Sequence, residues 1–343
     1  MSSEPELKKQ KTEETMSAEP VQALNICTHS GSFHADESLA VYMLRLLPRY
    51  GRGELTRSRD PKDWEAADIV VDVGAVYDGV KFFDHHQRGF TETFDDKHST
   101  KLSSAGLIYK HFGKEIITQL TSVKEEAVLD LLHVKIYEDF IEAIDANDNG
   151  INKFETEHPS APRFKDRAIT LPSIVSNLNP LWNEDNSDAA FDAKFSIACQ
   201  IMGNVFVDVV KNVGLSWLPA KQIVLQTINR RLEDHKSGKI LIFDQFVPWK
   251  EHLFELEKEL GIEGEILYAL FEDSGKNWRI AAVPKAASSF ESRKALPEKW
   301  RGLRDDVLSE ASGVEGCVFI HAAGFIGGAK TKEAVLKLAE LSL

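Results

Sequence analysis

Three short apolar runs near the start of this chain each end on a histidine or an aspartate. Runs of this length and composition predict buried strands, and a helical pattern over Asp36 to Leu47 follows the first of them. Strands that alternate with helices predict an α/β domain whose sheet is mostly parallel and flanked by helices. The runs and the polar residues that end them are Leu24 to Thr28 with His29, Ile69 to Val73 with Asp72, and Val80 to Phe83 with Asp84, His85 and His86.

The carboxyl ends of these predicted strands carry a set of potential metal ligands. Ligands bind at this edge in open α/β sheets, and a crowd of carboxylates would repel itself without cations. Imidazole and carboxylate without thiolate suit Mn²⁺, Mg²⁺ or Zn²⁺, and the surplus of ligands predicts two ions. The candidates are His29, His34, Asp36, Asp72, Asp84, His85 and His86, joined by Asp145 and Asp148 at the end of a helix predicted over Val123 to Ala146.

A centre of this kind indicates phosphoester hydrolysis. Two cations about 3.5–4 Å apart can activate a water molecule and stabilise the charge on the phosphate oxygens. A single histidine or aspartate at a strand end is more often a cap or a turn residue, so the prediction depends on the convergence of several loops. The remaining histidines lack such a context, and we expect ordinary hydrogen bonding for them.

The length of the chain, 343 residues, allows two domains. We predict a tail over residues 1–23, a metal-binding catalytic domain over 24–185, a helical connector over 186–236, and a smaller C-terminal α/β domain for substrate binding over 237–343. The three cysteines are far apart, which argues against a thiolate zinc site. No apolar run approaches the roughly 18 residues that span a bilayer, so we expect no membrane segment.

A glycine-rich segment between residues 316 and 331 is the second motif of the chain. The pattern predicts a strand, a glycine turn and a helix, an arrangement whose backbone N–H groups can hold a phosphate. His321, Gly327, Gly328 and Lys330 are therefore candidate substrate-binding residues. Alternatively, the glycines serve only a tight turn and close packing.

The charge of the chain limits how it can bind nucleic acid. With 54 acidic and 41 basic residues the formal net charge is −13, so such a contact must use local basic patches. Exposed tryptophans could stack bases, and the segment from Asn177 to Trp182 is a candidate loop over the site. The basic stretches are Arg45, Arg49, Arg52, Arg57, Arg59 and Lys62, and Lys285, Arg293, Lys294, Lys299, Arg301 and Arg304; the tryptophans are Trp182, Trp249, Trp278 and Trp300.

The polar motifs resemble those of the DHH phosphoesterase superfamily. Within it, the chain from about Leu24 onwards is similar to the family of the melanocyte-proliferating gene 1 protein, catalogued elsewhere as metal-dependent protein hydrolases. The resemblance implies a DHH-type catalytic domain. The motifs that carry it are Thr28 to Glu37, Val71 to Gly74, Phe83 to Gly89, Ser103 to Gly106 and Phe140 to Gly150.

This resemblance implies a metal-dependent 3′→5′ exonuclease that acts on single-stranded RNA or short oligonucleotides. It implies two divalent ions, with Mn²⁺ preferred and Mg²⁺ or Zn²⁺ left open because the first motif here has a histidine in place of a carboxylate. The implied catalytic residues are His86, which would contact the scissile phosphate, and Asp84, which would orient a neighbouring histidine. The implied ligands are His29, His34, Asp36, Asp72, His85 and Asp145.

Other functions are compatible with the same residues. The centre could cleave pyrophosphate, cyclic dinucleotides or short oligonucleotides, or the chain could be a non-catalytic metal-bound scaffold. A metallopeptidase fits poorly because the chain lacks a HExxH helix. The acidic N-terminus favours the nucleus or cytoplasm, and a mitochondrial location follows from the resemblance alone.

Overall fold

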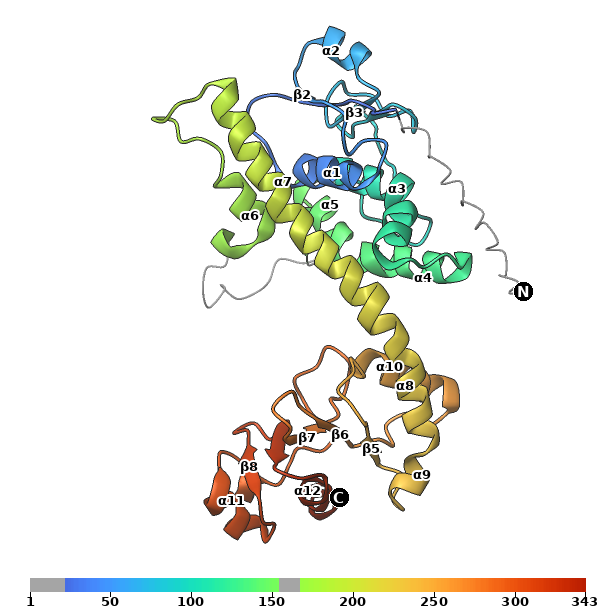
Figure 1. Ribbon diagram of the computed structural model, residues 1–343, viewed down its shortest axis with the longest axis vertical. Helices are drawn as coiled ribbons and strands as arrows, with labels where there is room; N and C mark the ends of the chain where they lie inside the picture. Colours follow the sequence, from blue (N-terminus) through green and yellow to red (C-terminus); the bar gives the residue numbers. More distant parts are fainter. Residues whose placement is uncertain (1–21, 154–166) are drawn as a thin grey trace, which may run out of the picture. The chain divides into compact units, whose positions relative to one another are not determined.

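The computed structural model describes residues 22–153 and 167–343, and these divide into two compact units (Figure 1). Unit 1 takes its residues from Met1–Gln119 and His133–Phe206, and unit 2 from Leu120–Leu132 and Val207–Leu343. Each unit holds a sheet covered by helices, which confirms the predicted α/β fold class. The predicted tail, apart from its last two residues, lies outside the described ranges.

The sheet of unit 1 has four parallel strands in the order β2-β1-β3-β4. Thr28 pairs with Val71, and Val71 pairs with Phe83, so three strands end at the same level of the sheet. The residues that follow them, His29, Asp72 and Asp84, therefore leave the sheet side by side. The strands are β1 (Ile26–Thr28), β2 (Leu55–Arg57), β3 (Ile69–Val71) and β4 (Phe82–Phe83).

Helices pack around this sheet and bring further polar residues to its carboxyl edge. The long helix α7 contacts α1 at Gly203, where an added Cβ would lie 2.1 Å from the Cγ atom of Tyr42. Glycine at this position is therefore required for the two helices to approach. The helices with residues in unit 1 are α1 (Ala35–Leu46), α2 (Pro61–Ala66), α3 (Ser104–Thr121), α4 (Glu126–Ile136), α5 (Glu142–Asp148), α6 (Leu171–Ser176) and α7 (Asp188–Lys211).

Two helical stretches contain a π-helical turn that their sequence patterns do not reveal. The helix predicted over Val123 to Ala146 consists of α4, a π turn at Tyr137–Ile141 and α5. After α7, a π turn at Asn212–Trp217 leads into α8 (Leu218–Asn229) and the short α9 (Arg231–Asp234). Pro219, which has no backbone N–H to donate, lies in the first turn of α8, just after this second π turn.

One helical stretch, Asp188–Asn229, is long and apolar enough to cross a membrane when judged by length and composition alone, with a mean hydropathy of 1.3. This differs from our expectation of no such segment, because a few charged residues interrupt the apolar residues of this stretch and no single continuous run stands out in the sequence. Core helices of globular proteins pass the same test, so the finding is weak evidence for a span.

Unit 2 has a five-stranded sheet in the order β5-β6-β7-β9-β8, in which only β5 and β6 pair in parallel. Ile240 and Ile242 face one apolar core and Leu241 faces another, as the alternation of a strand requires. Helices thus cover both faces of this sheet. The elements are β5 (Ile240–Ile242), β6 (Tyr268–Glu272), β7 (Trp278–Ala282), β8 (Cys317–Ile320), β9 (Ile326–Ala329), α10 (Lys250–Leu260), α11 (Asp305–Ser312) and α12 (Lys332–Ser342).

The glycine-rich segment near the C-terminus is a strand rather than a turn, so that part of the sequence prediction is wrong. Gly327 and Gly328 lie in β9, between β7 and β8. An added Cβ at Gly327 would lie 2.2 Å from the Cδ1 atom of Ile320. The glycines therefore serve close packing, and the hydroxyl of Thr331 caps α12 by accepting from Ala334 N.

Unit 2 also contains a buried ion pair that its fold depends on. Glu257 is 1% exposed, and its two carboxylate oxygens accept from Nη1 and Nη2 of Arg293 at 2.7 and 2.6 Å. The Glu257 carboxylate also accepts from the backbone N–H of Ile266 at 3.3 Å. Removing one partner of such a pair leaves an uncompensated buried charge.

We expect the Arg293→Met substitution to lower the free energy of unfolding of unit 2 by about 3–5 kcal/mol. The matched control is Lys221→Met, which removes an exposed pair with Glu255 and should cost no more than about 1 kcal/mol. Urea denaturation of the full chain, followed by tryptophan fluorescence, measures both. Equal midpoints for the two variants would contradict this assignment.

Candidate metal centre

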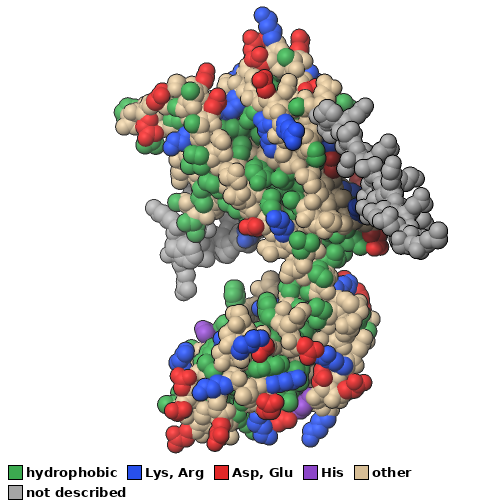
Figure 2. Space-filling view, in the orientation of Figure 1, with side chains coloured by type: hydrophobic (Ala, Val, Ile, Leu, Met, Phe, Trp, Pro, Cys, Tyr) green, Lys and Arg blue, Asp and Glu red, His purple; other side chains and the backbone are tan. Residues whose placement is uncertain are grey.

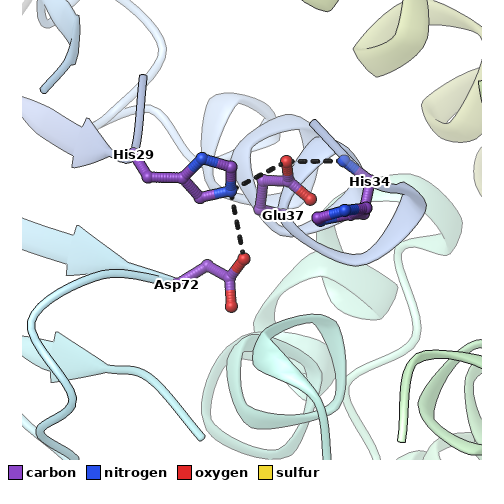
Figure 3. A group of neighbouring side chains, drawn as sticks. All are labelled: His29, His34, Glu37 and Asp72. Carbon is purple, nitrogen blue, oxygen red and sulfur yellow. Dashed lines mark hydrogen bonds and ion pairs between the residues drawn. The ribbon is translucent and has the colours of Figure 1, made fainter. Parts of the chain in front are cut away.

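The first group of potential ligands joins the loop after β1 to the end of β3 (Figure 3). The Nε2 atom of His29 lies 3.1 Å from Oε1 of Glu37 and 3.3 Å from Oδ2 of Asp72. Glu37 stands in the first turn of α1, where its Oε1 also accepts from the backbone N–H of His34 at 2.7 Å. This capping interaction fixes the carboxylate beside the imidazole.

A second group lies on the other side of Asp72. The Nε2 atom of His85 is 3.1 Å from Oδ2 of Asp148, 3.5 Å from Oδ1 of Asp72 and 4.0 Å from Oδ2 of Asp36. Asp72 thus directs one carboxylate oxygen to His29 and the other to His85. A carboxylate shared in this way is suited to bridge two cations.

The donor set of these groups fits divalent metal ions. Both carboxylate oxygens of Asp36, Oε2 of Glu37 and Nδ1 of His85 are buried without a hydrogen-bond partner among the described residues. Buried polar atoms are nearly always satisfied, so orphans gathered at one point fit a site that holds divalent cations. The groups with ligand atoms close enough to share an ion are His29, His34, Glu37 and Asp72; Asp72, His85 and His86; and Asp36, His85 and Asp148.

Protonation in the absence of a cation follows from the charges around each group. Burial alone would lower the pKa of His29, but the Asp72 and Glu37 carboxylates raise it to about 10. The pKa of His85 rises to about 9 because Asp148 and Asp72 outweigh its burial. A divalent ion at the centre would take the place of protons that these imidazoles otherwise hold.

The surroundings of the centre shift the pKa values of its two central carboxylates in opposite directions. Burial raises the pKa of Asp36 well above its usual value, and the neighbouring Asp72 and Asp148 charges add to the effect. Burial also acts to raise the pKa of Asp72, but hydrogen bonds with His29 and His85 hold it below its usual range. The lowered pKa favours the ionised form of the carboxylate in the middle of the centre.

The backbone holds Asp72 in an unusual conformation. Its φ angle is +56°, in the left-handed region that non-glycine residues rarely adopt. The Oγ atom of Ser104, at the start of α3, donates to Oδ1 of Asp72 at 2.8 Å, and the backbone N–H of Asp72 donates to Phe83 O at 3.1 Å. Strain of this kind persists where surrounding contacts over-determine the position, as at functional sites.

Neighbouring groups orient the imidazoles. The Nδ1 atom of His29 lies 3.2 Å from Ser30 O, which leaves Nε2 free to face the carboxylates. The Nδ1 atom of His86 lies 2.8 Å from Oδ1 of Asp84, whose Oδ2 accepts from the backbone N–H of Ala75 at 2.6 Å. The side chain of His86 is 60% exposed, so its ring is both fixed and accessible.

Asp145, which the sequence predicts as a metal ligand, belongs to none of these groups. Its Oδ1 accepts from the backbone N–H and hydroxyl of Ser103 at 2.9 and 2.7 Å and from Gly106 N at 3.1 Å. Burial raises the pKa of this carboxyl to about 7. Asp145 thus caps the start of α3, and Asp148, one turn later in α5, lies at the centre instead.

The candidate substrate residues of the C-terminal segment all belong to unit 2. Gly327 and Gly328 are buried in β9, while His321 and Lys330 are exposed. The Nδ1 atom of His321 accepts from the backbone N–H of Ala323 at 3.1 Å within its own turn. The structure gives these residues no shared cradle for a phosphate.

Ion pairs interrupt both of the predicted basic stretches. Arg49 pairs with Glu115 at 2.6 Å, Arg57 pairs with Asp192 at 2.9 Å, and Arg293 belongs to the buried pair described above. Figure 2 shows acidic and basic side chains interspersed over the visible face of unit 2. The basic stretches therefore do not act as continuous cationic tracks.

The predicted tryptophan and loop contacts are divided between core and surface. Trp249 and Trp300 are buried in unit 2, whereas Trp182 is 90% exposed. The side chain of Asn179 accepts from Phe33 N at 3.0 Å and donates to Phe33 O at 2.9 Å. This pairing fastens the predicted loop to the segment that carries His34.

Two cavities of unit 1 open at the centre. The larger has a volume of about 880 Å³ and the smaller about 470 Å³. His34 and His86 line both. The larger is also lined by Ala35, Asp36, His85, Lys101, Ile144, Asn147, Asp148, Asn149, Ala168, Pro172, Ser173, Ser176 and Asn177, and the smaller by His29, Arg59, Trp64, Asp72, Val73, Gly74, Ala75 and Asp84.

Sequence reasoning missed two residues at this site. Glu37 stands three residues after His34, a spacing typical of a capping box at the start of a helix. This spacing explains Glu37 as a capping residue and gives no sign of its second contact, with His29. Trp64 lies in a half-exposed helix with no periodic signal. Both residues are seen to face the centre only once the strands are paired, because this pairing brings together segments that are distant in sequence.

We expect the Asp36→Asn substitution to abolish most of the rise in thermal midpoint that Mn²⁺ produces in the wild-type protein. A ligand that binds only the folded state stabilises it by RT ln(1 + L/Kd), where L is the free ligand concentration. Without metal, the variant should be at least as stable as the wild type, because it loses a buried orphan carboxylate. Differential scanning fluorimetry with EDTA or Mn²⁺ checks both statements, and a full Mn²⁺ response in the variant would contradict them.

A second pair of variants separates the two aspartates of α5. Asp148→Asn should weaken Mn²⁺ binding at least about ten-fold. Losing a residue that only supports a metal ligand already costs about 10- to 100-fold in affinity, and the loss of a ligand should cost no less. Asp145→Asn keeps an acceptor oxygen for Ser103 and Gly106 and should bind Mn²⁺ like the wild type. Isothermal titration calorimetry measures both affinities. The reverse outcome would restore Asp145 as a ligand.

Comparison with known proteins places the chain in a family. Residues 25–343 match the family model MYG1_exonuc, described as Uncharacterised protein family (UPF0160). The chain is 60% identical over 321 residues to the MYG1 protein of Saccharomyces cerevisiae, a match that covers 93% of this chain and 95% of the relative. It is 44% identical over 326 residues to the MYG1 exonuclease of Bos taurus, covering 93% of this chain and 84% of the relative.

Among solved structures, the crystal structure of exonuclease RecJ bound to manganese aligns with 93% of this chain and 90% of its own, at 11% identity and a TM-score of 0.22. A score this low carries no argument about fold or chemistry. The sequence matches do not depend on it, since they cover nearly the whole chain at high identity. The protein therefore belongs to the MYG1 exonuclease family.

Proposed function

We propose that this protein is a metal-dependent exonuclease that shortens single-stranded RNA from its 3′ end. The observation that carries the proposal is the carboxylate of Asp72, shared between two groups of ligands at a sheet edge where two cavities meet. Relatives in cattle and human carry the name MYG1 exonuclease, which supports the same class of reaction.

The residues present would hold two cations, with Mn²⁺ as the proposed ion. Bound there, two divalent cations supply Lewis-acid stabilisation of phosphate charge and lower the pKa of a water molecule. Oxygen and imidazole donors without thiolate are compatible with Mn²⁺. The proposed first site is His29, His34, Glu37 and Asp72, and the proposed second site is Asp36, Asp72, His85 and Asp148.

In the proposed reaction a water molecule adds to the phosphorus of the last phosphodiester. The bond between phosphorus and the 3′ oxygen of the preceding nucleotide breaks, and that oxygen takes a proton to become the new terminal hydroxyl. The last nucleotide leaves as a 5′-monophosphate. The water thus supplies the hydroxyl that the released phosphate gains.

His86 is the residue best placed to contact the reacting phosphate. Its ring borders both cavities, and its hydrogen bond with Asp84 raises the pKa of His86 above the usual histidine value. An imidazole that is fixed and exposed in this way can donate a hydrogen bond to phosphate oxygens and stabilise the charge that develops on them. Asp84 acts through this ring as a positioning residue.

The larger cavity offers groups suited to the sugar-phosphate backbone. Lys101 provides a cation, and Asn147, Asn149 and Asn177 provide amides that can donate to and accept from sugar hydroxyls. With a net charge of −13, the protein does not attract a polyanion from a distance, so binding depends on this cavity and on the cations of the centre.

We expect the wild-type protein with Mn²⁺ to convert a 5′-labelled single-stranded RNA into a ladder that shortens from the 3′ end, and EDTA to abolish it. His85→Ala should lower the rate at least about 100-fold, beyond the 10- to 100-fold cost of losing a residue that supports a metal ligand. His111→Ala removes an exposed histidine outside the centre and is the control.

Parallel substrates decide between the alternatives. Equal shortening of single-stranded DNA would contradict the RNA preference. Hydrolysis of pyrophosphate without any cleavage of RNA would replace the exonuclease by a small-substrate phosphoesterase. Failure of all substrates with Mn²⁺, Mg²⁺ and Zn²⁺ would favour a metal-bound scaffold.

A further inference from the structure

We infer that the smaller cavity is a subsite for the single nucleotide being removed, where Arg59 contacts its phosphate and Trp64 stacks on its base. The inference rests on the proposed exonuclease function. The inference goes beyond that function by assigning one of the two cavities to the released nucleotide and the other to the remaining strand.

The position of the two cavities carries the first step. His34 and His86 border both of them, so a strand that places a phosphate at His86 extends to either side of the centre. The smaller cavity, at about 470 Å³, lies in the lower part of the range that holds one small ligand, and the larger is about 880 Å³. The smaller one suits a single nucleotide.

Arg59 supplies an anion-binding group in this cavity. Its Nε atom donates to Ser30 O at 3.2 Å, and Nη2 lies 3.2 Å from Nδ1 of His29. Unlike Arg49 and Arg57 of the same stretch, it forms no ion pair with a carboxylate among the described residues. The guanidinium is thus anchored beside the centre with donors left over, the geometry that recognises phosphate oxygens.

Trp64 supplies a fixed aromatic surface in the same cavity. Its indole N–H donates to Ser58 O at 3.1 Å, and part of the ring packs against the apolar cluster that includes Val70 and Val73. The ring is half-buried, so its orientation is held while the rest of its surface lines the cavity. Stacking on such a ring binds any base without reading its sequence.

The larger cavity differs in kind. Its described lining contains no tryptophan, tyrosine or phenylalanine. Apart from the histidines and aspartates of the centre, its polar groups are those of Lys101, asparagines and serines. It can therefore bind sugars and phosphates but offers no indole for a base. This asymmetry assigns the stacked nucleotide to the side of Arg59 and Trp64.

The test is a titration of the Mn²⁺-loaded full chain with adenosine 5′-monophosphate and, separately, with inorganic phosphate, followed by calorimetry. Arg59→Met should raise the Kd for both probes. Trp64→Leu should raise the Kd for the nucleotide at least about five-fold, as expected for one lost base stack, and leave that for phosphate unchanged. Matched controls are Arg49→Met and Trp182→Leu, which lie outside the lining of the smaller cavity.

The outcomes separate this subsite from the exonuclease activity. Unchanged nucleotide affinity in the Arg59 and Trp64 variants, or an equal loss in the Trp182 control, overturns the subsite even if the wild type shortens RNA. Nucleotide binding that depends on Arg59 and Trp64 supports the subsite even if RNA is not cleaved, in which case the exonuclease proposal fails alone. Thermal midpoints confirm folding, and exposed Arg59 provides the safer variant if Trp64→Leu is unstable.

Discussion

The carboxylate of Asp72 connects the fold of unit 1 to its chemistry. The parallel register of β1, β3 and β4 delivers this residue beside His29 and Asp84, and the left-handed turn of its backbone aims it between two imidazoles. Ser104 fixes the remaining freedom of the side chain. If this one carboxylate moved, the two groups of ligands would no longer share a member, and the smaller cavity would lose part of its lining.

The buried polar groups of the centre lower the stability of unit 1 when no cation is bound. Buried polar groups without a partner, such as the Asp36 carboxylate and Nδ1 of His85, oppose folding when no cation compensates the charges of the centre. Around them, the apolar core of the sheet and the close contact of α1 with α7 at Gly203 supply the opposing stabilisation. The metal-free state is therefore a folded protein with a locally unfavourable centre, as expected where function competes with stability.

Much of this site could be predicted because strand periodicity is a local property. Three apolar runs followed by His29, Asp72 and Asp84 suffice to predict that these residues share an edge. Glu37 and Trp64 could not be found in this way, since their roles depend on which side chain lies opposite in space. The glycines of β9 show the converse error: a glycine pattern is equally compatible with a turn that binds phosphate and with a strand that must pack closely.

The π-helical turn at Tyr137–Ile141 sets which residues of α5 reach the centre. A π turn contains one more residue than an α turn, and one residue corresponds to about 100° of rotation around a helix axis. Loss of a single residue there would turn α5 so that Asp148 no longer faced His85, although every ligand would still be encoded. The rotation of α5 about its axis, as well as the identity of its residues, therefore determines whether the centre forms.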